Sequence, residues 1–283
     1  MPNPLRIGAV PYVNAWPLLY GLEGRSDVRL QAAEPAALGP MLRRGEVDVA
    51  LVPAIEYFRL SADSQERARP YPGRLAAPPR FVVLPVAAIG SRGRCGSVRL
   101  FGYAEMEKVR RVLLDPASRS SNALAQVLLV RRFGVRAHYV FPREAGQAPA
   151  RRPDAELVIG DRGLVAERPQ AEWTLDLGVE WNRFVHLPFV FAVWAARGDA
   201  PLAEAAAILR EAREAGLEAR EALAERAQCE RGIPAELALD YLLHEVRYDF
   251  GRKQREGLTV FYRMAAQEGL APEGGRLRLG PEA

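Results

Sequence analysis

The segment Phe81-Val82-Val83-Leu84-Pro85-Val86-Ala87-Ala88-Ile89 is one of two long apolar runs that decide how this chain folds. The second run, from Phe184 to Ala196, comes much later in the sequence and is interrupted by Pro188. Apolar runs rich in branched and aromatic residues indicate buried strands. Because the residues between the two runs contain strands and helices of their own, we expect the chain to leave one lobe through the first strand and to return through the second.

The rest of the pattern indicates an α/β protein. Strand-like segments at Leu5 to Val10 and Asp48 to Val52 alternate with a helical segment at Pro35 to Arg44, which is typical of mainly parallel sheets. From Pro201 onward the sequence is almost wholly helical. We therefore expect an α/β fold with two lobes of the type II periplasmic-binding-protein kind, two crossover strands and a helical C-terminal region. A single doubly wound domain with a helical tail is the alternative.

The two crossover strands also set the expected lobe boundaries. The first lobe is expected to be discontinuous, with residues 1–86 and 190–283, and the second to contain residues 87–189. In an open α/β sheet, ligands bind at the carboxyl ends of the strands. The cleft between the lobes is therefore the expected ligand site.

Composition restricts the class of protein. The chain has 283 residues, of which 49% are apolar and 26% charged, which suits a globular protein of two lobes. We see no apolar stretch of membrane-spanning length and no secretion signal before Leu5, so we expect a cytoplasmic protein without membrane insertion. Neither Cys95 nor Cys229 belongs to a CxxC pair, so we expect no disulfide framework and no zinc site.

Charge and motifs narrow the possible partners. The net charge is +4, and the basic residues are almost all arginines scattered among acidic ones. This pattern lacks a nucleic-acid-binding motif and suits a small anionic ligand. The sequence also lacks GxGxxG, GxxxxGK[ST], HExxH and GxSxG motifs, so we expect neither a cofactor nor a metal. His138, His186 and His244 are expected to be structural.

A polar cluster, Asp115-Pro116-Ala117-Ser118-Arg119-Ser120-Ser121-Asn122, lies between an apolar run and a helical segment. The first N–H groups of a helix lack intrahelical partners, and the helix dipole favours an anion beside them. With the hydroxyls and Arg119 added, the cluster predicts a site for a carboxylate or phosphate. The alternative is an ordinary capped helix.

Three other turns follow strand-like segments and are candidates for the same cleft. The first contains Tyr12 and Asn14, and the second follows the strand that ends at Pro53. The third is Gly160-Asp161, where glycine allows close backbone approach and Asp161 could orient a ligand hydroxyl or cap a turn. For Asn14 the alternative is a cap on a short helix.

Taken in order, these turns resemble a known family, the chorismate dehydratases of the futalosine route to menaquinone. The resemblance runs in register from about Leu5 to Trp194 and more loosely to Leu270. The segments that carry it are Ile7 to Leu18, Gly45 to Pro53, Asp115 to Ser121, Ile159 to Asp161, and Leu187 to Trp194.

The resemblance implies a cofactor-free lyase that converts chorismate to 3-[(1-carboxyvinyl)oxy]benzoate and water. Loss of the C3 proton and the C4 hydroxyl makes the ring aromatic, so the enzyme mainly binds and orients a dicarboxylate. We expect Ser120, Ser121 and the helix N-terminus to hold one carboxylate, with Arg119 either helping or bracing the loop. Asn14 would lie over the reacting face and position the enolpyruvyl carboxylate or a water to take the proton.

The sequence departs from the family pattern at three places. Ser120 stands where threonine is usual, and Ala54 where serine is frequent. Val185-His186 replaces the more usual Thr-Gly, which is expected to put a ring near the hinge and to alter the shape of the cleft.

Two rival functions use the same fold. The first is the 1,4-dihydroxy-6-naphthoate synthase of the same pathway, whose usual sequence begins differently from the Tyr12 turn. The second is a solute-binding protein for aromatic anions, which would carry a secretion signal or a lipobox cysteine. The binding domain of a transcriptional regulator would need an N-terminal helix-turn-helix, for which Leu5 to Val10 leaves no room. The sequence does not indicate an oligomeric state.

Overall fold

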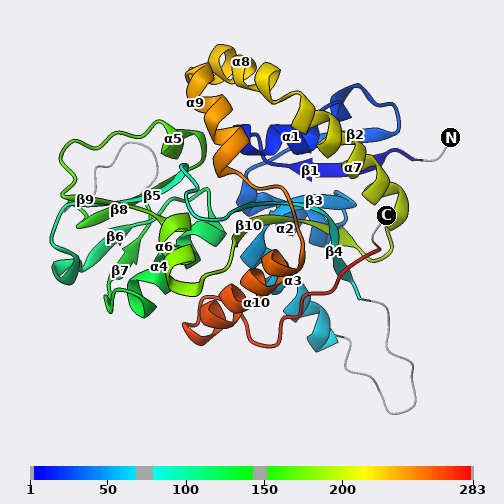
Figure 1. The fold of residues 1–283 in the computed structure, drawn as a ribbon. Coiled ribbons are helices and arrows are strands. Elements are labelled where there is room, and N and C mark those ends of the chain that lie inside the picture. The colour runs from blue at the N-terminus through cyan, green and yellow to red at the C-terminus, as the bar shows by residue number, and fades with distance from the viewer. Residues whose placement is uncertain (1–2, 68–78, 143–151, 282–283) are drawn as a thin grey trace.

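The computed structural model describes residues 3–67, 79–142 and 152–281, and it contains two five-stranded sheets that lie side by side (Figure 1). Sheet A has the order β2-β1-β3-β10-β4, and sheet B has the order β7-β6-β8-β5-β9. The strands of sheet A are β1 (Leu5–Ala9), β2 (Val28–Ala32), β3 (Val49–Pro53), β4 (Phe81–Ser91) and β10 (Phe189–Arg197). The strands of sheet B are β5 (Val98–Gly102), β6 (Arg111–Leu113), β7 (His138–Val140), β8 (Ala155–Ile159) and β9 (Trp173–Asp176).

The two crossover strands are present and pair with each other. β4 and β10 run antiparallel, from Phe189 opposite Ser91 to Arg197 opposite Phe81. β10 begins at Phe189 and not at Phe184, because Phe184 and Val185 form the last turn of a helix whose C-cap is His186. The observed architecture confirms the expected two-lobed α/β class. All described strands between β4 and β10 belong to sheet B, but the exact lobe boundaries stay a prediction.

Both sheets are mixed and not mainly parallel. β1 pairs in parallel with β2 and β3, and β6 pairs in parallel with β7 and β8. The antiparallel strands are β10, which returns from the second lobe, and β5, which enters it. A strand that arrives from the opposite lobe runs antiparallel to its neighbours. The crossovers therefore explain why the sheets are mixed, whereas the sequence had predicted mainly parallel sheets.

Helices cover the sheets and connect the lobes (Figure 1). Those before β10 are α1 (Trp16–Leu19), α2 (Pro35–Arg44), α3 (Ala54–Arg67), α4 (Arg119–Arg131), α5 (Gly160–Leu164) and α6 (Leu177–Val185). The helical C-terminal region contains α7 (Leu202–Glu218), α8 (Arg220–Arg231), α9 (Ala235–Asp240), a π-helix (Tyr241–Glu245) and α10 (Arg252–Gln267). Short 3₁₀ turns occur at Val13–Ala15, Leu22–Gly24 and Met106–Lys108.

An aromatic cluster packs the second lobe against the first. The Trp181 ring of α6 meets the Phe189 ring of β10 edge-on at 5.3 Å and the Phe261 ring of α10 at 6.0 Å. All three side chains are almost fully buried. Buried aromatic rings contribute large apolar areas and prefer such edge-to-face contacts. The C-terminal helix α10 therefore stabilises the junction of the two lobes.

Candidate active site

A cavity lies between the lobes, at the ends of β1, β3 and β8. Its lining combines apolar residues with hydroxyl, amide and backbone groups. The lining includes Tyr12, Asn14, Ser97, Ser118, Ser121, Gly160 and Tyr241. Of the described residues that line the cavity, none carries a charged side chain. An anion in this cavity would therefore be bound by hydroxyls, amides and backbone N–H groups.

Asn14 lies on the 3₁₀ turn Val13–Ala15, directly after β1. Its backbone carbonyl accepts a 2.9 Å hydrogen bond from the Tyr248 hydroxyl. Its side-chain Oδ1 is shielded from solvent and has no hydrogen-bond partner among the described residues. A buried acceptor without a partner costs free energy, so this oxygen is a natural contact for a ligand donor.

The Tyr12 ring and Gly160 meet across the cleft. Gly160 has a left-handed backbone with φ of +62°, and a Cβ at this position would lie 3.5 Å from the Tyr12 ring. The Tyr12 hydroxyl donates to Glu34 Oε2 at 3.3 Å. Burial raises the pKa of Tyr12, and Glu34 raises it further. Tyr12 therefore remains neutral and forms part of the cavity wall.

Residues 118–121 of the polar cluster divide into two pairs. Ser118 is the N-cap of α4, since its Oγ accepts from the Ser121 N–H at 3.1 Å, and both residues line the cavity. Ser120 Oγ instead accepts from the Ile55 N–H of α3 at 3.3 Å. Arg119 Nε lies 3.6 Å from Glu56 Oε2. The capped-helix and cavity interpretations both apply to Ser118, whereas Ser120 and Arg119 fasten α4 to α3 and do not line the cavity.

Asp161 joins the lobes next to Asn14 and does not itself line the cavity. Its Oδ1 accepts from the Val13 N–H at 3.0 Å, and its Oδ2 lies 4.0 Å from Arg231 Nε. Arg231 in turn donates to the Pro11 carbonyl at 2.8 Å. Burial raises the pKa of Asp161, while the Val13 N–H and Arg231 partly offset this effect.

Sequence reasoning missed two hydroxyls of the cavity. Tyr241 comes from the π-helix and is only 2% exposed, and its hydroxyl lies 2.8 Å from Ser97 Oγ. Ser97 follows the first crossover strand and a short stretch with Gly90, Gly93 and Gly96, which is a weak signal of a turn. Tyr241 lies in a helical stretch that gives no local sign of a ligand site. Cys95 also lines the cavity, and burial, followed by Asp176, raises the pKa of its thiol.

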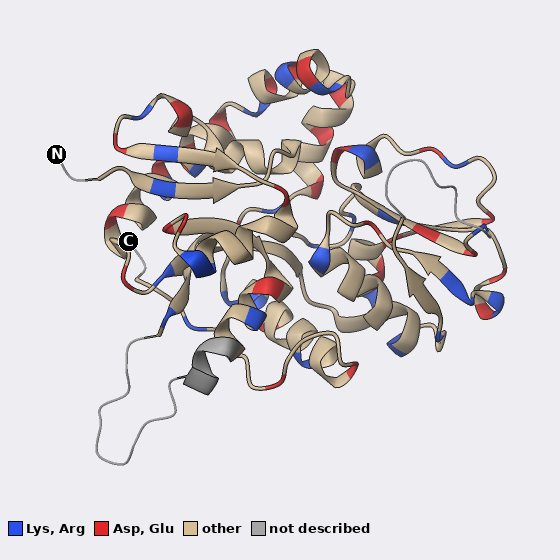
Figure 2. Ribbon diagram, turned by 180° about the vertical axis from the view of Figure 1, so that it is seen from behind, with Lys and Arg blue, Asp and Glu red and all other residues tan. Residues whose placement is uncertain are grey.

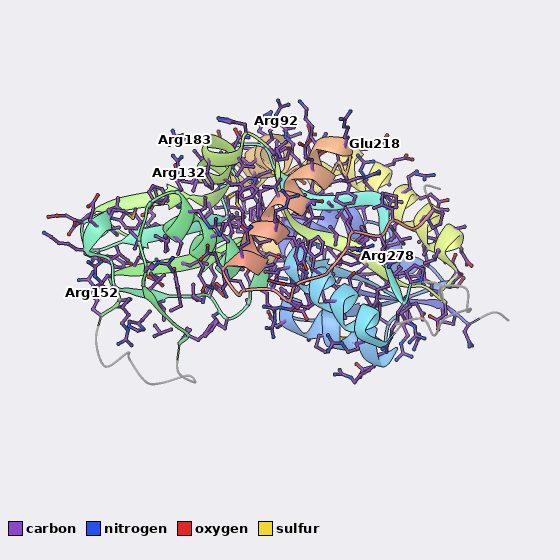
Figure 3. The ribbon with its side chains drawn as sticks, turned by 90° about the horizontal axis from the view of Figure 1, so that it is seen from below. Arg92, Arg132, Arg152, Arg183, Glu218 and Arg278 are labelled. Atoms are coloured by element: carbon purple, nitrogen blue, oxygen red, sulfur yellow. The ribbon has the colours of Figure 1, made fainter. Side chains whose placement is uncertain are left out.

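In the described part of the chain, no arginine side chain lines the cavity. Figure 2 shows basic and acidic residues interspersed over both lobes. Arg132 and Arg183, which lie together at the lobe of sheet B in Figure 3, both pair with the buried Glu180, at 2.7 and 2.9 Å. Of the two roles expected for Arg119, contact with a carboxylate or bracing of the loop, its position beside Glu56 and outside the cavity lining fits the second.

The departures from the family pattern lie outside the cavity lining. Ala54 is fully buried at the start of α3. His186 is exposed and has a φ of +60°, the one positive φ of a non-glycine residue in the described ranges. A left-handed backbone favours glycine, which explains why glycine is usual here. In residues 3–67, 79–142 and 152–281, no group of His, Cys, Asp or Glu could hold a metal ion, and no helix is long and apolar enough to cross a membrane.

The two lobes and the cavity between them define a fold of the periplasmic-binding-protein type. The chain resembles a solved protein of Archaeoglobus fulgidus with a TM-score of 0.70 and 17% identity, over 94% of this chain and 98% of that one. It also resembles the periplasmic aliphatic sulphonate binding protein SsuA of Escherichia coli, with a TM-score of 0.59 and 17% identity over 96% and 95% of the two chains. At this identity the likeness establishes the fold alone.

Sequence comparison then gives the family. The family model described as menaquinone biosynthesis matches residues 5–65 and 74–267. The curated chorismate dehydratase of Thermus thermophilus is 33% identical over 276 residues, which cover 92% of this chain and 94% of that protein. This chain belongs to the menaquinone biosynthesis family, as the resemblance of its turns predicted.

Proposed function

We propose that this protein is a chorismate dehydratase, which converts chorismate to 3-[(1-carboxyvinyl)oxy]benzoate and water in menaquinone biosynthesis. The observation that carries the proposal is the near full-length similarity to the curated chorismate dehydratase. The geometry adds support, since the Asn14 turn and the start of α4 line one cavity. The reaction class is a carbon–oxygen lyase that releases water.

One carboxylate of chorismate would be bound at the start of α4. Ser118 and Ser121 line the cavity there, and the first turn of a helix offers unpaired N–H groups and the positive end of its dipole. Charge-assisted hydrogen bonds from such donors are the stronger kind. Ser121 would therefore contact this carboxylate, while Ser120 would act by holding α4 against α3.

The chemistry needs a proton acceptor, and the cavity lining provides no conventional one. The described lining contains no Asp, Glu, His or Lys. Tyr241 and Cys95 remain protonated, because burial raises the pKa of both groups. The remaining acceptors are the enolpyruvyl carboxylate of the substrate and a water. Asn14 would position one of these, so that catalysis depends on orientation and on fixed dipoles.

The test is a direct assay with purified protein. Chorismate would be incubated with the protein and a chelator, without added metal or nucleotide, and the products separated by chromatography and weighed by mass spectrometry. Enzyme-dependent loss of one water supports the proposal. Chorismate that binds in a calorimeter but returns unchanged would identify a solute-binding protein, and chorismate that does not bind would reject both functions. Cell fractionation would test the cytoplasmic location.

A further inference from the structure

The C-terminal segment 241–248 holds Asn14 through two tyrosines. The Tyr248 hydroxyl donates to the Asn14 carbonyl at 2.9 Å, which fixes the backbone. Tyr241 and Asn14 both line the cavity, and the Tyr241 hydroxyl is held at 2.8 Å by Ser97 Oγ. Tyr241 begins a π-helix, a local irregularity that is frequent at functional sites. The main chain of Asn14 thus has a partner in Tyr248, and its side chain shares the cavity with Tyr241.

The two ends of the Asn14 amide are chemically different. Nδ2 carries two donor hydrogens, whereas Oδ1 only accepts. The Asn14 side chain is hydrogen-bonded to Tyr241, and Oδ1 has no partner in the described part of the chain, which leaves Nδ2 as the end that donates to the Tyr241 oxygen. The electrostatics agree: burial raises the pKa of Tyr241, but Ser97 and Asn14 lower it, as donors to its oxygen do.

We propose that Tyr241, held by Ser97, is a positioning residue that fixes the Asn14 amide so that Oδ1 accepts the C4 hydroxyl of the bound substrate. The inference rests on the proposed function. Chorismate has two carboxylates, an ether oxygen and one hydroxyl, so at neutral pH its C4 hydroxyl is its sole O–H donor. The free acceptor of Asn14 therefore orients the departing hydroxyl toward the first lobe, with a carboxylate at Ser118 and Ser121.

The same contact distinguishes the substrate from the product. Dehydration removes the C4 hydroxyl, so the product has no donor for Asn14 Oδ1. An acceptor left buried and unpaired weakens binding by about 5-fold to 100-fold, from the usual cost of an unsatisfied polar group. The product therefore binds less tightly than the substrate and leaves the cavity. Without the Tyr241 hydroxyl, the amide can turn and offer Nδ2 to the oxygens of either ligand.

The test measures one ratio, the product inhibition constant divided by the KM for chorismate, in the wild type and in Tyr241→Phe. We expect KM to rise about tenfold, from loss of one positioned hydrogen bond, and the product constant to stay within twofold or to fall. Ser97→Ala should shift the same ratio in the same direction by a smaller factor. The matched control is Tyr103→Phe, which removes a hydroxyl that donates to Glu156 in the second lobe, outside the cavity lining. It should leave the ratio unchanged.

The outcomes separate this inference from the proposed function. The inference is supported if the wild type is active and the ratio falls in Tyr241→Phe but not in Tyr103→Phe. If the wild type is active and the ratio is unchanged in both Tyr241→Phe and Ser97→Ala, this inference is wrong and the proposed function stands. This holds even if KM and the product constant rise together. If Tyr241→Phe does not fold, an unchanged ratio in Ser97→Ala has the same force. A wild type that does not dehydrate chorismate overturns the proposed function and this inference with it.

Discussion

Replacing Asp161 with alanine removes the carboxylate that ties the second lobe to the Asn14 turn. Asp161 Oδ1 accepts from the Val13 N–H at 3.0 Å, one residue before Asn14, and its side chain is 19% exposed. Alanine would leave this N–H without an acceptor. The Asn14 turn would then be held less firmly against the second lobe, although no cavity-lining group is lost.

The magnitude follows from two opposing contributions. A hydrogen bond to a charged group contributes about 1.5–3 kcal/mol. Burial raises the pKa of Asp161, so part of this gain is offset by the cost of burying the charge. The distant and exposed contact with Arg231 adds little. We expect Asp161→Ala to remove a net of about 1.4 kcal/mol from the free energy that holds the Asn14 turn against the second lobe. This corresponds to an about tenfold lower kcat/KM for chorismate.

Two further variants make the test specific. Asp161→Asn keeps an acceptor for Val13 and should stay within about threefold of the wild type, since only the charge is lost. Asp154→Ala removes a carboxylate that accepts from Arg110 and Arg111 within the second lobe, so it should lower stability and leave kcat/KM unchanged. The reasoning is refuted if Asp161→Ala keeps the wild-type kcat/KM, or if Asp161→Asn falls as far as the alanine variant.

Three other outcomes are expected. Asn14→Ala should lower kcat at least about 10²-fold while calorimetry shows chorismate binding weakened by only about tenfold, from the one lost hydrogen bond, and near-normal turnover would remove Asn14 from the mechanism. His186→Gly should raise the free energy of unfolding in urea by about 0.5–1 kcal/mol, because glycine adopts the +60° φ without strain, and a loss of stability would contradict this reason. Burial alone raises the pKa of Asp48, but the hydrogen bonds from Arg6 outweigh it and hold this pKa below its ordinary value. Asp48 therefore stabilises the fold above its unfolded pKa of about 3.9 and loses this contribution as the pH falls through its lower folded pKa, so Asp48→Asn should cost about 1–2 kcal/mol at pH 7 and much less at low pH; a pH-independent difference in urea titrations would count against it.

The sequence predicted those parts of the site that depend on local chemistry. The polar cluster Asp115 to Asn122 was expected at the start of a helix, and Ser118 within it is the N-cap; Ser121 and Asn14 were expected in the cleft and line the cavity. These residues follow strand ends or begin helices, so their positions along the chain already restrict where they lie. Their roles with substrate stay predictions.

Other parts of the site could not be predicted because they depend on packing between distant segments. Ser120 and Ser121 are adjacent in sequence, yet Ser120 faces Ile55 and Ser121 faces the cavity. Successive residues of a helix point about a hundred degrees apart, and only the position of α3 decides which face meets the ligand. Tyr241 reaches Ser97 only because the C-terminal helices return to the interlobe junction.

The sequence by itself determined the fold class, the two crossover strands, the family and the start of a helix at the polar cluster Asp115 to Asn122, because periodicity, caps and motif order are local properties. The tertiary structure alone decided that the described cavity lining has no charged side chain, that Arg119 and Asp161 join the lobes, and that Tyr241 shares the cavity with Asn14. These features require side chains from segments far apart in sequence to meet, and the contacts are set by how both sheets and the returning helices pack.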